Sequence, residues 1–530
     1  MSGKPKQFRF EEEARVSLRD GIDQLAEVVA MTLGPRGRNV GLQASWGSPT
    51  ITSDGHSIAK DIEFKDPFLN MGASMAKEVA AKIKEKSGDG TTTGIILLRA
   101  LVQGGVKNIA SGANPTSIKR GMDKALALVL QEIDKMAIAV DGTADTKNIA
   151  SVSASGNQEV GEIIAECFAK AGKSGVVTIE EGKGTETTIE LVEGMQFDRG
   201  YISSYFCTNV EKMIAEMVNP FILITDKKIN SAHEILPILQ HVATVAGQLL
   251  IIADDLDGDA LSTLVMNRLR GSLKVVAVKA PAFGDRRKSI LEDLAILTGA
   301  ELITDDKGMV LKDATASILG SAEQVIVSKD KTTIVGGKGD ADLLKDRIFQ
   351  IDAEIATATS DYDKEKLEER KAKLQGGVAV IKVGAPTETE MKKKKQMFED
   401  SLNSTRAALE EGIVPGGGVT LLRASKAADT SSLNKEEAVG AKILLHACES
   451  PFKQIASNAG FDGSVLLEEV LQGIKNTGFN AITERVEDLI KAGVIDPVKV
   501  VKNCLIYAVS VASVVLLSEA LMADEEDDTI

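Results

Sequence analysis

Residues 87–102 read SGDGTTTGIILLRALV, in which two glycines flank Asp89 and three threonines precede an apolar run. The run predicts a helix that is apolar on nearly every side, and a helix of this kind is normally buried. Its start then points free backbone N–H groups and the positive end of the helix dipole into an interior site. Because such a helix start attracts phosphate, these residues indicate a phosphate-binding site inside a folded core.

The loop before this helix adds two features that suit a phosphate site. Gly88 and Gly90 allow positive φ and let the backbone approach an anion closely. Asp89 offers a hard oxygen ligand for a Mg²⁺ ion that bridges phosphates. The alternative is an ordinary helix N-cap after a turn, although a cap requires only one Thr or Asp. These residues by themselves leave both interpretations open.

The composition is that of a globular protein with about two to four domains. The 530 residues are 43% apolar and 26% charged. The net charge of −15 argues against a nucleic-acid partner, because binding a phosphate backbone requires clustered Lys and Arg. The four cysteines have no CxxC spacing and the N-terminus has no apolar signal region, which predicts reduced thiols in a cytoplasmic protein. The apolar run 505–517 is too short to cross a membrane and predicts a buried core helix.

The hydrophobic pattern changes twice along the chain. Helical periodicity dominates residues 16–134, with a hairpin predicted between residues 39 and 55. Strands are predicted at 176–179, 187–191, 221–224, 249–252 and 275–278, and helices at 231–245 and 259–270 separate the last three. This alternation implies a βαβ layer with parallel pairing. Residues 343–374 predict two antiparallel charged helices, and the chain is mainly helical again from about residue 389.

Several motifs resemble, in order and spacing, the nucleotide-site motifs of group I chaperonins, the GroEL family. They are Thr32-Leu33-Gly34-Pro35-Arg36-Gly37-Arg38-Asn39-Val40, Thr50-Ile51-Thr52-Ser53-Asp54-Gly55 and Gly88-Asp89-Gly90-Thr91-Thr92-Thr93. The resemblance continues through Pro281-Ala282-Phe283-Gly284-Asp285-Arg286-Arg287, Gly416-Gly417-Gly418 and Asp496-Pro497, and covers essentially the whole chain except its two ends. A second phosphate-loop candidate, Ala171-Gly172-Lys173-Ser174, is rejected because Cys167 stands where that motif requires glycine.

The resemblance implies a multidomain α and α/β fold with one domain inserted inside another. A helical equatorial domain would comprise residues 8–135 and 411–518, and a small α+β intermediate domain residues 136–192 and 379–410. An inserted α/β apical domain would comprise residues 193–378, and an acidic tail residues 519–530. Gly194, Gly376 and Gly377 stand at the apical junctions, where glycine can absorb the backbone change of a hinge; ordinary turns are the alternative.

The resemblance also implies an ATP site with Mg²⁺ and K⁺. Asp89 looks like the magnesium ligand, and Asp54 and Asp400 look like the catalytic carboxylates near the attacking water. The phosphates would contact Thr32, Leu33, Gly34, Pro35, Gly90, Thr91, Thr92 and Thr93, and the adenosine would contact Gly417, Asn480, Ala481 and Asp496. Because Asp496 precedes Pro497, helix capping is its alternative role.

One departure from the family pattern lies beside Asp54. The family usually has lysine in Thr-Ile-Thr-Lys-Asp-Gly, whereas this chain has Ser53. Loss of that cation predicts weaker nucleotide binding or altered coupling. Ser53, Gln43 and the acidic C-terminus also motivate an alternative, a specialised paralogue that assembles but hydrolyses ATP poorly. A small-molecule kinase is a third hypothesis, for which the sequence has no metabolite-site motif.

The predicted apical helices carry apolar residues over about half of their circumference, wider than one buried stripe requires. From periodicity alone they would be ordinary core helices. The resemblance implies a binding surface for unfolded proteins and a GroES-type co-chaperonin, formed by Tyr201, Tyr205, Phe206, Leu236, Leu239, Leu261, Val265 and Met266. It further implies homo-oligomeric rings of seven subunits, single or stacked, and an Arg199–Glu388 ion pair that must break between subunits during the cycle.

Overall fold

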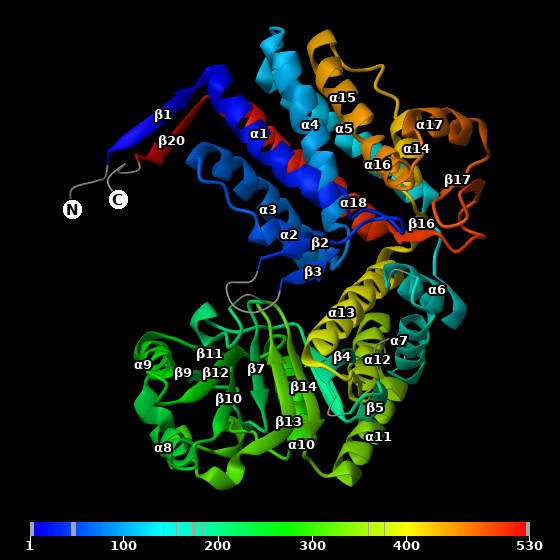
Figure 1. Cartoon of the computed structure of the whole chain (residues 1–530). Coiled ribbons are helices and arrows are strands. Elements are labelled where there is room, and N and C mark those ends of the chain that lie inside the picture. The colour runs from blue at the N-terminus through cyan, green and yellow to red at the C-terminus, as the bar shows by residue number, and fades with distance from the viewer. Residues whose placement is uncertain are drawn as a thin grey trace. The chain divides into compact units, whose positions relative to one another are not determined.

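The structure is a computed structural model that describes residues 5–43, 49–140, 142–154, 156–171, 176–182, 184–210, 212–358, 360–375 and 377–525. The chain divides into two compact units, which Figure 1 shows by residue colour. The first unit combines Met1–Ala165 with Lys392–Ile530, and the second is Glu166–Met391. The rejected loop at residues 172–174 and the predicted hinge residue Gly376 lie outside the described residues.

Helices from both ends of the chain share the core of the first unit. They are α1 (Glu11–Ala30), α3 (Pro67–Ser87), α4 (Thr91–Ala110), α5 (Pro115–Met136), α15 (Lys435–Ala447) and α18 (Val498–Leu517). Leu18 of α1, Leu97 of α4 and Leu505 of α18 are fully buried in one hydrophobic cluster. The apolar helix predicted after Asp89 is therefore a core helix, as its pattern required.

Helix α18 is longer than the apolar run from which it was predicted. Its 20 residues make it the one helix, among the described residues, with the length and composition to cross a membrane. The length argument against a membrane span was therefore wrong. The packing supports the core-helix prediction, because α18 lies against α3, α4 and α5 and Leu505, Ala508 and Ala512 are fully buried.

Shorter elements lie wholly or mostly in the first unit. The helices are α2 (Gly55–Asp61), α6 (Thr143–Ser153), α7 (Gln158–Ala171), α13 (Glu388–Glu411), α14 (Val419–Ala427), α16 (Ser450–Asn458) and α17 (Gly463–Gln472). Of these, α7 and α13 continue into the second unit. The strand pairs are β2 (Val40–Leu42) with β3 (Thr50–Thr52), β16 (Ile413–Pro415) with β19 (Ile495–Pro497), and β17 (Thr477–Asn480) with β18 (Arg485–Asp488). The β2–β3 pair is antiparallel, which confirms the predicted hairpin.

The two chain ends also pair as strands. β1 (Lys6–Phe10) is antiparallel to β20 (Ala520–Asp524), and Phe8 lies opposite Met522. The segment predicted as an acidic tail therefore begins as a strand, because backbone pairing with β1 orders it. Residues 526–530 lie outside the described residues.

The second unit is built on a seven-stranded sheet in the order β12-β10-β8-β13-β14-β6, with β7 paired to β13. Its strands are β6 (Gly194–Phe197), β7 (Ala215–Val218), β8 (Phe221–Ile224), β10 (Gln248–Ala253), β12 (Lys274–Lys279), β13 (Gly320–Val327) and β14 (Thr332–Gly337). Strands β8, β10 and β12 are parallel, which confirms the βαβ prediction. The other pairs are antiparallel, and the sequence pattern did not predict them.

Helices and a second sheet complete this unit. The helices are α8 (Leu236–Thr244), α9 (Gly258–Leu269), α10 (Gly284–Thr298), α11 (Ala341–Thr357) and α12 (Asp361–Gln375), and a small strand pair joins β9 (Lys228–Ile229) to β11 (Asp255–Leu256). The second sheet has the order β4-β15-β5, formed by Val176–Glu181, Val378–Val383 and Thr188–Val192. Gly377 precedes β15 with a φ of +62°, and Gly194 begins β6.

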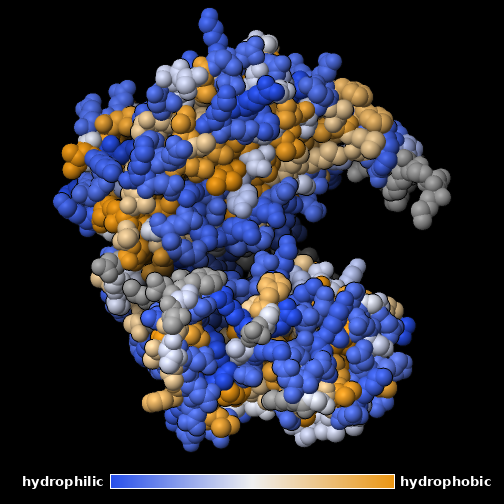
Figure 2. All heavy atoms as spheres, turned by 180° about the vertical axis from the view of Figure 1, so that it is seen from behind, coloured by the Kyte–Doolittle hydropathy of each residue, from blue (hydrophilic) through white to orange (hydrophobic). Residues whose placement is uncertain are grey.

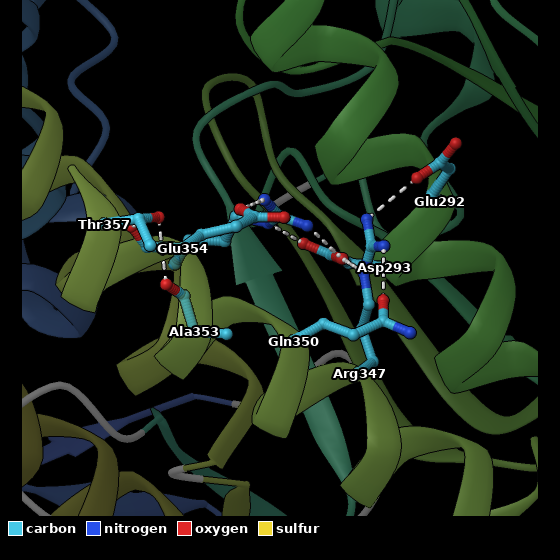
Figure 3. Close-up of polar contacts among 8 residues, drawn as sticks. Glu292, Asp293, Arg347, Gln350, Ala353, Glu354 and Thr357 are labelled. Carbon is cyan, nitrogen blue, oxygen red and sulfur yellow. Dashed lines mark hydrogen bonds and ion pairs between the residues drawn. The ribbon is translucent and has the colours of Figure 1, made fainter.

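A buried carboxylate fastens the charged helices α11 and α12 to α10. Asp293 of α10 is fully buried and accepts hydrogen bonds from Arg347 of α11, at 2.8 Å, and from Arg370 of α12, at 2.7 Å (Figure 3). Arg347 also donates to Glu292 at 2.8 Å. These two helices were predicted as a pair with solvated faces. Both helices are present, but one face of the pair is held against α10 by the ion pairs of Arg347 and Arg370 with Asp293.

Candidate functional site

The start of α4 has the form that the sequence predicted for a phosphate site. Its N-cap residue is Gly90, with φ of 91°, and no side chain caps the helix. Asp89 does not cap the helix either, because its Oδ1 accepts from the Gly90 N–H at 2.6 Å and its Oδ2 accepts from the Ser153 hydroxyl at 3.0 Å. The ordinary N-cap interpretation is therefore wrong, and the first-turn N–H groups remain available to an anion.

Three glycines pack the surrounding elements against this helix start. A Cβ on Gly90 would lie 2.5 Å from Cys504 Sγ of α18, and one on Gly88 would lie 2.2 Å from Asn403 Cβ of α13. A Cβ on Gly55 would lie 2.2 Å from Thr92 Oγ1. The start of α4 is thus in close contact with the beginning of α2, with α13 and with α18.

Alanine at position 90 tests this packing. We expect Gly90→Ala to lower the free energy of unfolding by more than about 1–2 kcal/mol, the cost of a left-handed non-glycine residue, because the new Cβ also meets Cys504. ADP affinity should fall with it. Gly112→Ala is the matched control, since Gly112 has φ of +93° and open space around its Cβ position. Equal losses in chemical denaturation of the two variants would contradict the packing argument.

Asp54 stands at the start of α2 as its N-cap. Its Oδ2 accepts from the Ser57 N–H at 3.0 Å and from the Ser57 hydroxyl at 2.6 Å. Burial opposes ionisation of this carboxyl group, but the charge of Lys84 and the bonds from Ser57 outweigh burial and lower its pKa. The predicted second acidic residue is therefore an ionised carboxylate held in one orientation.

Asp400 reaches the site from α13. Its Oδ1 forms an ion pair with Lys84 Nζ and accepts from Gln396 Nε2 at 2.8 Å. Burial is the main cause that raises the pKa of Asp400 to about 7, and the charges of Asp89 and Asp54 add to it against the effect of Lys84. Asp400 therefore lies within electrostatic reach of both Asp89 and Asp54.

Lys84 is a residue that the sequence reasoning missed. It lies in the last turn of α3, and its carbonyl accepts from the Gly88 N–H. Burial disfavours its charged form, but the neighbouring carboxylates, chiefly Asp400 and Asp54, outweigh burial and raise its pKa. The available signal was its position one helical turn before Gly88, at the end of the helix that leads into the phosphate loop.

The loop that follows α1 is joined to the segment predicted to hold adenosine. Thr32 is buried and its hydroxyl donates to the Val29 carbonyl at 2.8 Å, Gly34 has φ of +83°, and Pro35 is exposed beside it. Arg36, which could have faced phosphate, donates instead to the Ala481 carbonyl at 3.3 Å and to Glu484 at 2.9 Å. These bonds place the Thr32–Pro35 loop next to residues 480–484.

The remaining predicted adenosine contacts come from three separate segments of the chain. Asn480 Oδ1 accepts from the Ile482 N–H at 3.0 Å, so its side chain orders its own turn, and Ala481 is buried. Gly417 has φ of +64° just beyond β16. Asp496 lies in the paired strand β19, and burial together with the charge of Asp89 raises its pKa to about 7. Pro497, not Asp496, is the N-cap residue of α18, so the capping role proposed for Asp496 is wrong.

The carboxylates suit Mg²⁺ only in combination with phosphate. Among the described residues, no three His, Cys, Asp or Glu side chains lie close enough to hold a metal ion by themselves. Mg²⁺ normally uses one or two carboxylates together with phosphate oxygens and water. Asp89 beside an uncapped helix start fits that donor set.

An uncapped helix start beside several carboxylates, in a helical unit made from both chain ends, is the arrangement expected of a nucleotide-dependent protein of multidomain α and α/β architecture. Residues 25–526 match the TCP-1/cpn60 chaperonin family, and the chain belongs to that family. It is 64% identical over 524 residues to Chaperonin GroEL 3 of Protochlamydia amoebophila (strain UWE25), covering 99% of this chain and 98% of that protein. The resemblance to group I chaperonins is confirmed, and with it the function of an ATP-dependent chaperone.

The residues predicted to bind clients lie in the second unit and differ in exposure. Tyr205 is 63% exposed, Met266 48% and Leu236 39%, whereas Tyr201, Leu261 and Val265 are half-buried. Phe206 is completely buried and Leu239 nearly so, which corrects their assignment to an exposed surface: both pack in the core of this unit. Leu269 of α9, which the prediction did not include, is 60% exposed.

Proposed function

We propose that this chaperonin hydrolyses ATP at the start of α4 and uses the cycle to bind and release non-native proteins. The observation that carries the proposal is the convergence of Asp54, Asp89 and Asp400 on one uncapped helix start. Phosphoryl transfer to water requires bound phosphates, Mg²⁺ and a carboxylate that orients the water. This site offers a separate residue for each requirement.

Each part of the nucleotide has a proposed contact. The first-turn N–H groups and hydroxyls of Thr91–Thr93 bind the phosphates, with Gly90 and the Thr32–Pro35 loop, and Asp89 holds Mg²⁺, which would neutralise phosphate charge. Asp54 and Asp400 orient the attacking water and accept its proton. Gly417, Asn480, Ala481 and Asp496 contact adenosine. K⁺ is a further proposed cofactor.

Phosphate release is the direct test of this function. We expect K⁺-dependent hydrolysis of ATP that responds to unfolded protein and to a GroES-type co-chaperonin. Negligible turnover by intact rings would favour the paralogue with weak ATPase, for which the comparisons give no specific support. Turnover that depends on a small metabolite would instead favour a kinase.

Apolar side chains of α8 and α9 form the proposed client surface, defined by the exposed Leu236, Met266 and Leu269 and the half-buried Leu261 and Val265. Apolar contact does not discriminate among sequences, which suits clients that share only exposed core residues. One subunit would bind weakly, and a ring would bind strongly because its identical sites act together. The same surface is the proposed contact for the co-chaperonin.

Serine at position 236 tests this surface. Burial of one leucine contributes about 1.5–3 kcal/mol, so we expect Leu236→Ser to weaken capture of a denatured protein about tenfold. Leu343→Ser is the control, since Leu343 is 57% exposed on α11, outside the proposed surface. Equal capture of the denatured protein by assembled Leu236→Ser and Leu343→Ser would contradict the proposal.

Assembly into homo-oligomeric rings of seven, single or stacked, is part of the proposal, and the β1–β20 pair offers a surface for contact between subunits. It exposes Phe8, Phe10 and Met522, and this part of the first unit is orange to tan at the upper right of Figure 2. Exposed apolar side chains on a two-stranded sheet with open edges suit contact with a second subunit.

A cytoplasmic location and the absence of nucleic-acid or membrane partners complete the proposal.

The three-domain division stays a proposal: residues 8–135 with 411–518, residues 136–192 with 379–410, and residues 193–378. The predicted Arg199–Glu388 pair also stays a prediction. The guanidinium of Arg199 lies over the Phe283 ring, 5.3 Å from its centroid.

A further inference from the structure

Lys84 places an ammonium group among the carboxylates of the proposed nucleotide site. Lys84 Nζ pairs with Asp400, and the two side chains are only 22% and 21% exposed. The charges of Asp54 and Asp89 also act on Lys84. His56 and Asp496 are titratable groups beside this cluster: burial lowers the pKa of His56, which favours neutral imidazole, and burial with the charge of Asp89 raises that of Asp496 to about 7. Lys84 therefore brings a positive charge directly to these three carboxylates.

Ser53 leaves this chain without the lysine that the family usually has beside Asp54, so the charge of Lys84 can take its place. Group I chaperonins usually carry lysine at that position, directly before the aspartate that corresponds to Asp54. Here Ser53 is exposed and has no charge to offer. The structure nevertheless brings a cation to Asp54, from the end of α3 instead of from the β3–α2 loop.

We propose that Lys84 is a positioning residue that replaces, from α3, the site cation missing at Ser53, and that it attracts the nucleotide phosphates and holds Asp400 beside the α4 start. The proposal rests on the proposed ATP site. Three carboxylates without a cation would repel a nucleotide, because like charges in a partly buried site are weakly screened. The ammonium offsets part of that repulsion before Mg²⁺ and nucleotide arrive.

Binding of ADP to the assembled protein tests the proposal without hydrolysis. We expect Lys84→Met to raise the calorimetric Kd for ADP about tenfold or more, with a larger change when Mg²⁺ is removed by chelation. Lys84→Arg should stay close to wild type, because it keeps the charge. Lys82→Met is the matched control: Lys82 is on the same helix, 50% exposed, and pairs with Glu85 on the surface.

Relocating the charge distinguishes replacement from a structural role. We expect Ser53→Lys to restore ADP affinity in the Lys84→Met background, although position 53 lies on a different element. If Lys84→Met does not assemble, Lys84→Gln removes the charge while keeping a hydrogen-bond donor toward Asp400. Its ADP affinity is then measured with and without Ser53→Lys.

Two results would overturn the inference: ADP affinity unchanged in Lys84→Met, or affinity that Ser53→Lys fails to restore. Failure of the wild-type protein to bind ADP at all would instead remove the proposed function. The two failures are therefore distinguishable in one titration series.

Discussion

Alanine in place of Asp400 should lower phosphate release at saturating ATP by at least about 100-fold, the lower end of what a general base contributes. Nucleotide binding should persist or become tighter, because the substitution removes a negative charge beside the phosphates. We expect hydrolysis and nucleotide binding to respond differently because Asp400 lies among the carboxylates of the site but belongs to α13, not to the phosphate loop. Single-turnover hydrolysis and ADP titration measure the two effects separately.

Glu410→Ala is the control for Asp400. Glu410 lies on the same helix, is exposed, and pairs with Lys499 on the surface. Its removal should change hydrolysis by less than about threefold, because surface pairs contribute only about 0–1 kcal/mol. An Asp400→Ala enzyme that turns over within a few-fold of wild type would eliminate Asp400 as the catalytic carboxylate.

The second large effect is structural. Asp293→Ala removes a fully buried carboxylate that accepts from Arg347 and Arg370 and leaves two guanidinium groups without their shared partner. Breaking a buried pair in this way typically costs about 3–5 kcal/mol. We expect amide hydrogen exchange in α10, α11 and α12 of the full chain to accelerate on the order of 10²–10³-fold.

Asp363→Ala provides the comparison on α12. Asp363 pairs with Arg286 at 3.0 Å, but both side chains are about half exposed. Its loss should cost about 0–1 kcal/mol. Similar exchange rates in the two variants would show that burial of Asp293 does not secure these helices.

Local sequence signals predicted those parts of the fold that depend on local physics. The all-round apolar pattern of α4 identified a buried helix, but the glycines around Asp89 left open whether a side chain caps its start, which the structure shows is not the case. Short apolar runs that alternate with helical segments predicted the parallel strands β8, β10 and β12. The antiparallel strands β13 and β14 were missed because pairing between distant segments leaves no periodic signal.

The same limit applies to the site. Asp400 was identified only through the family resemblance, because one carboxylate among 77 acidic residues has no distinguishing local pattern. Lys84 was missed because its ion pair joins residues that are 316 positions apart. Phe206 was assigned to the surface by resemblance, whereas its contacts with other elements bury it. Long-range packing decides each of these outcomes.

The central claim is that nucleotide at the α4 start controls whether the apolar side chains of α8 and α9 are available to a client. Hydrogen exchange and client binding, measured together on the assembled Asp400→Ala variant with and without ATP and Mg²⁺, test it most directly, because bound ATP then persists. The account predicts that ATP protects α8 and α9 from exchange and releases the denatured client. Unchanged exchange and undiminished client binding at saturating ATP would contradict it.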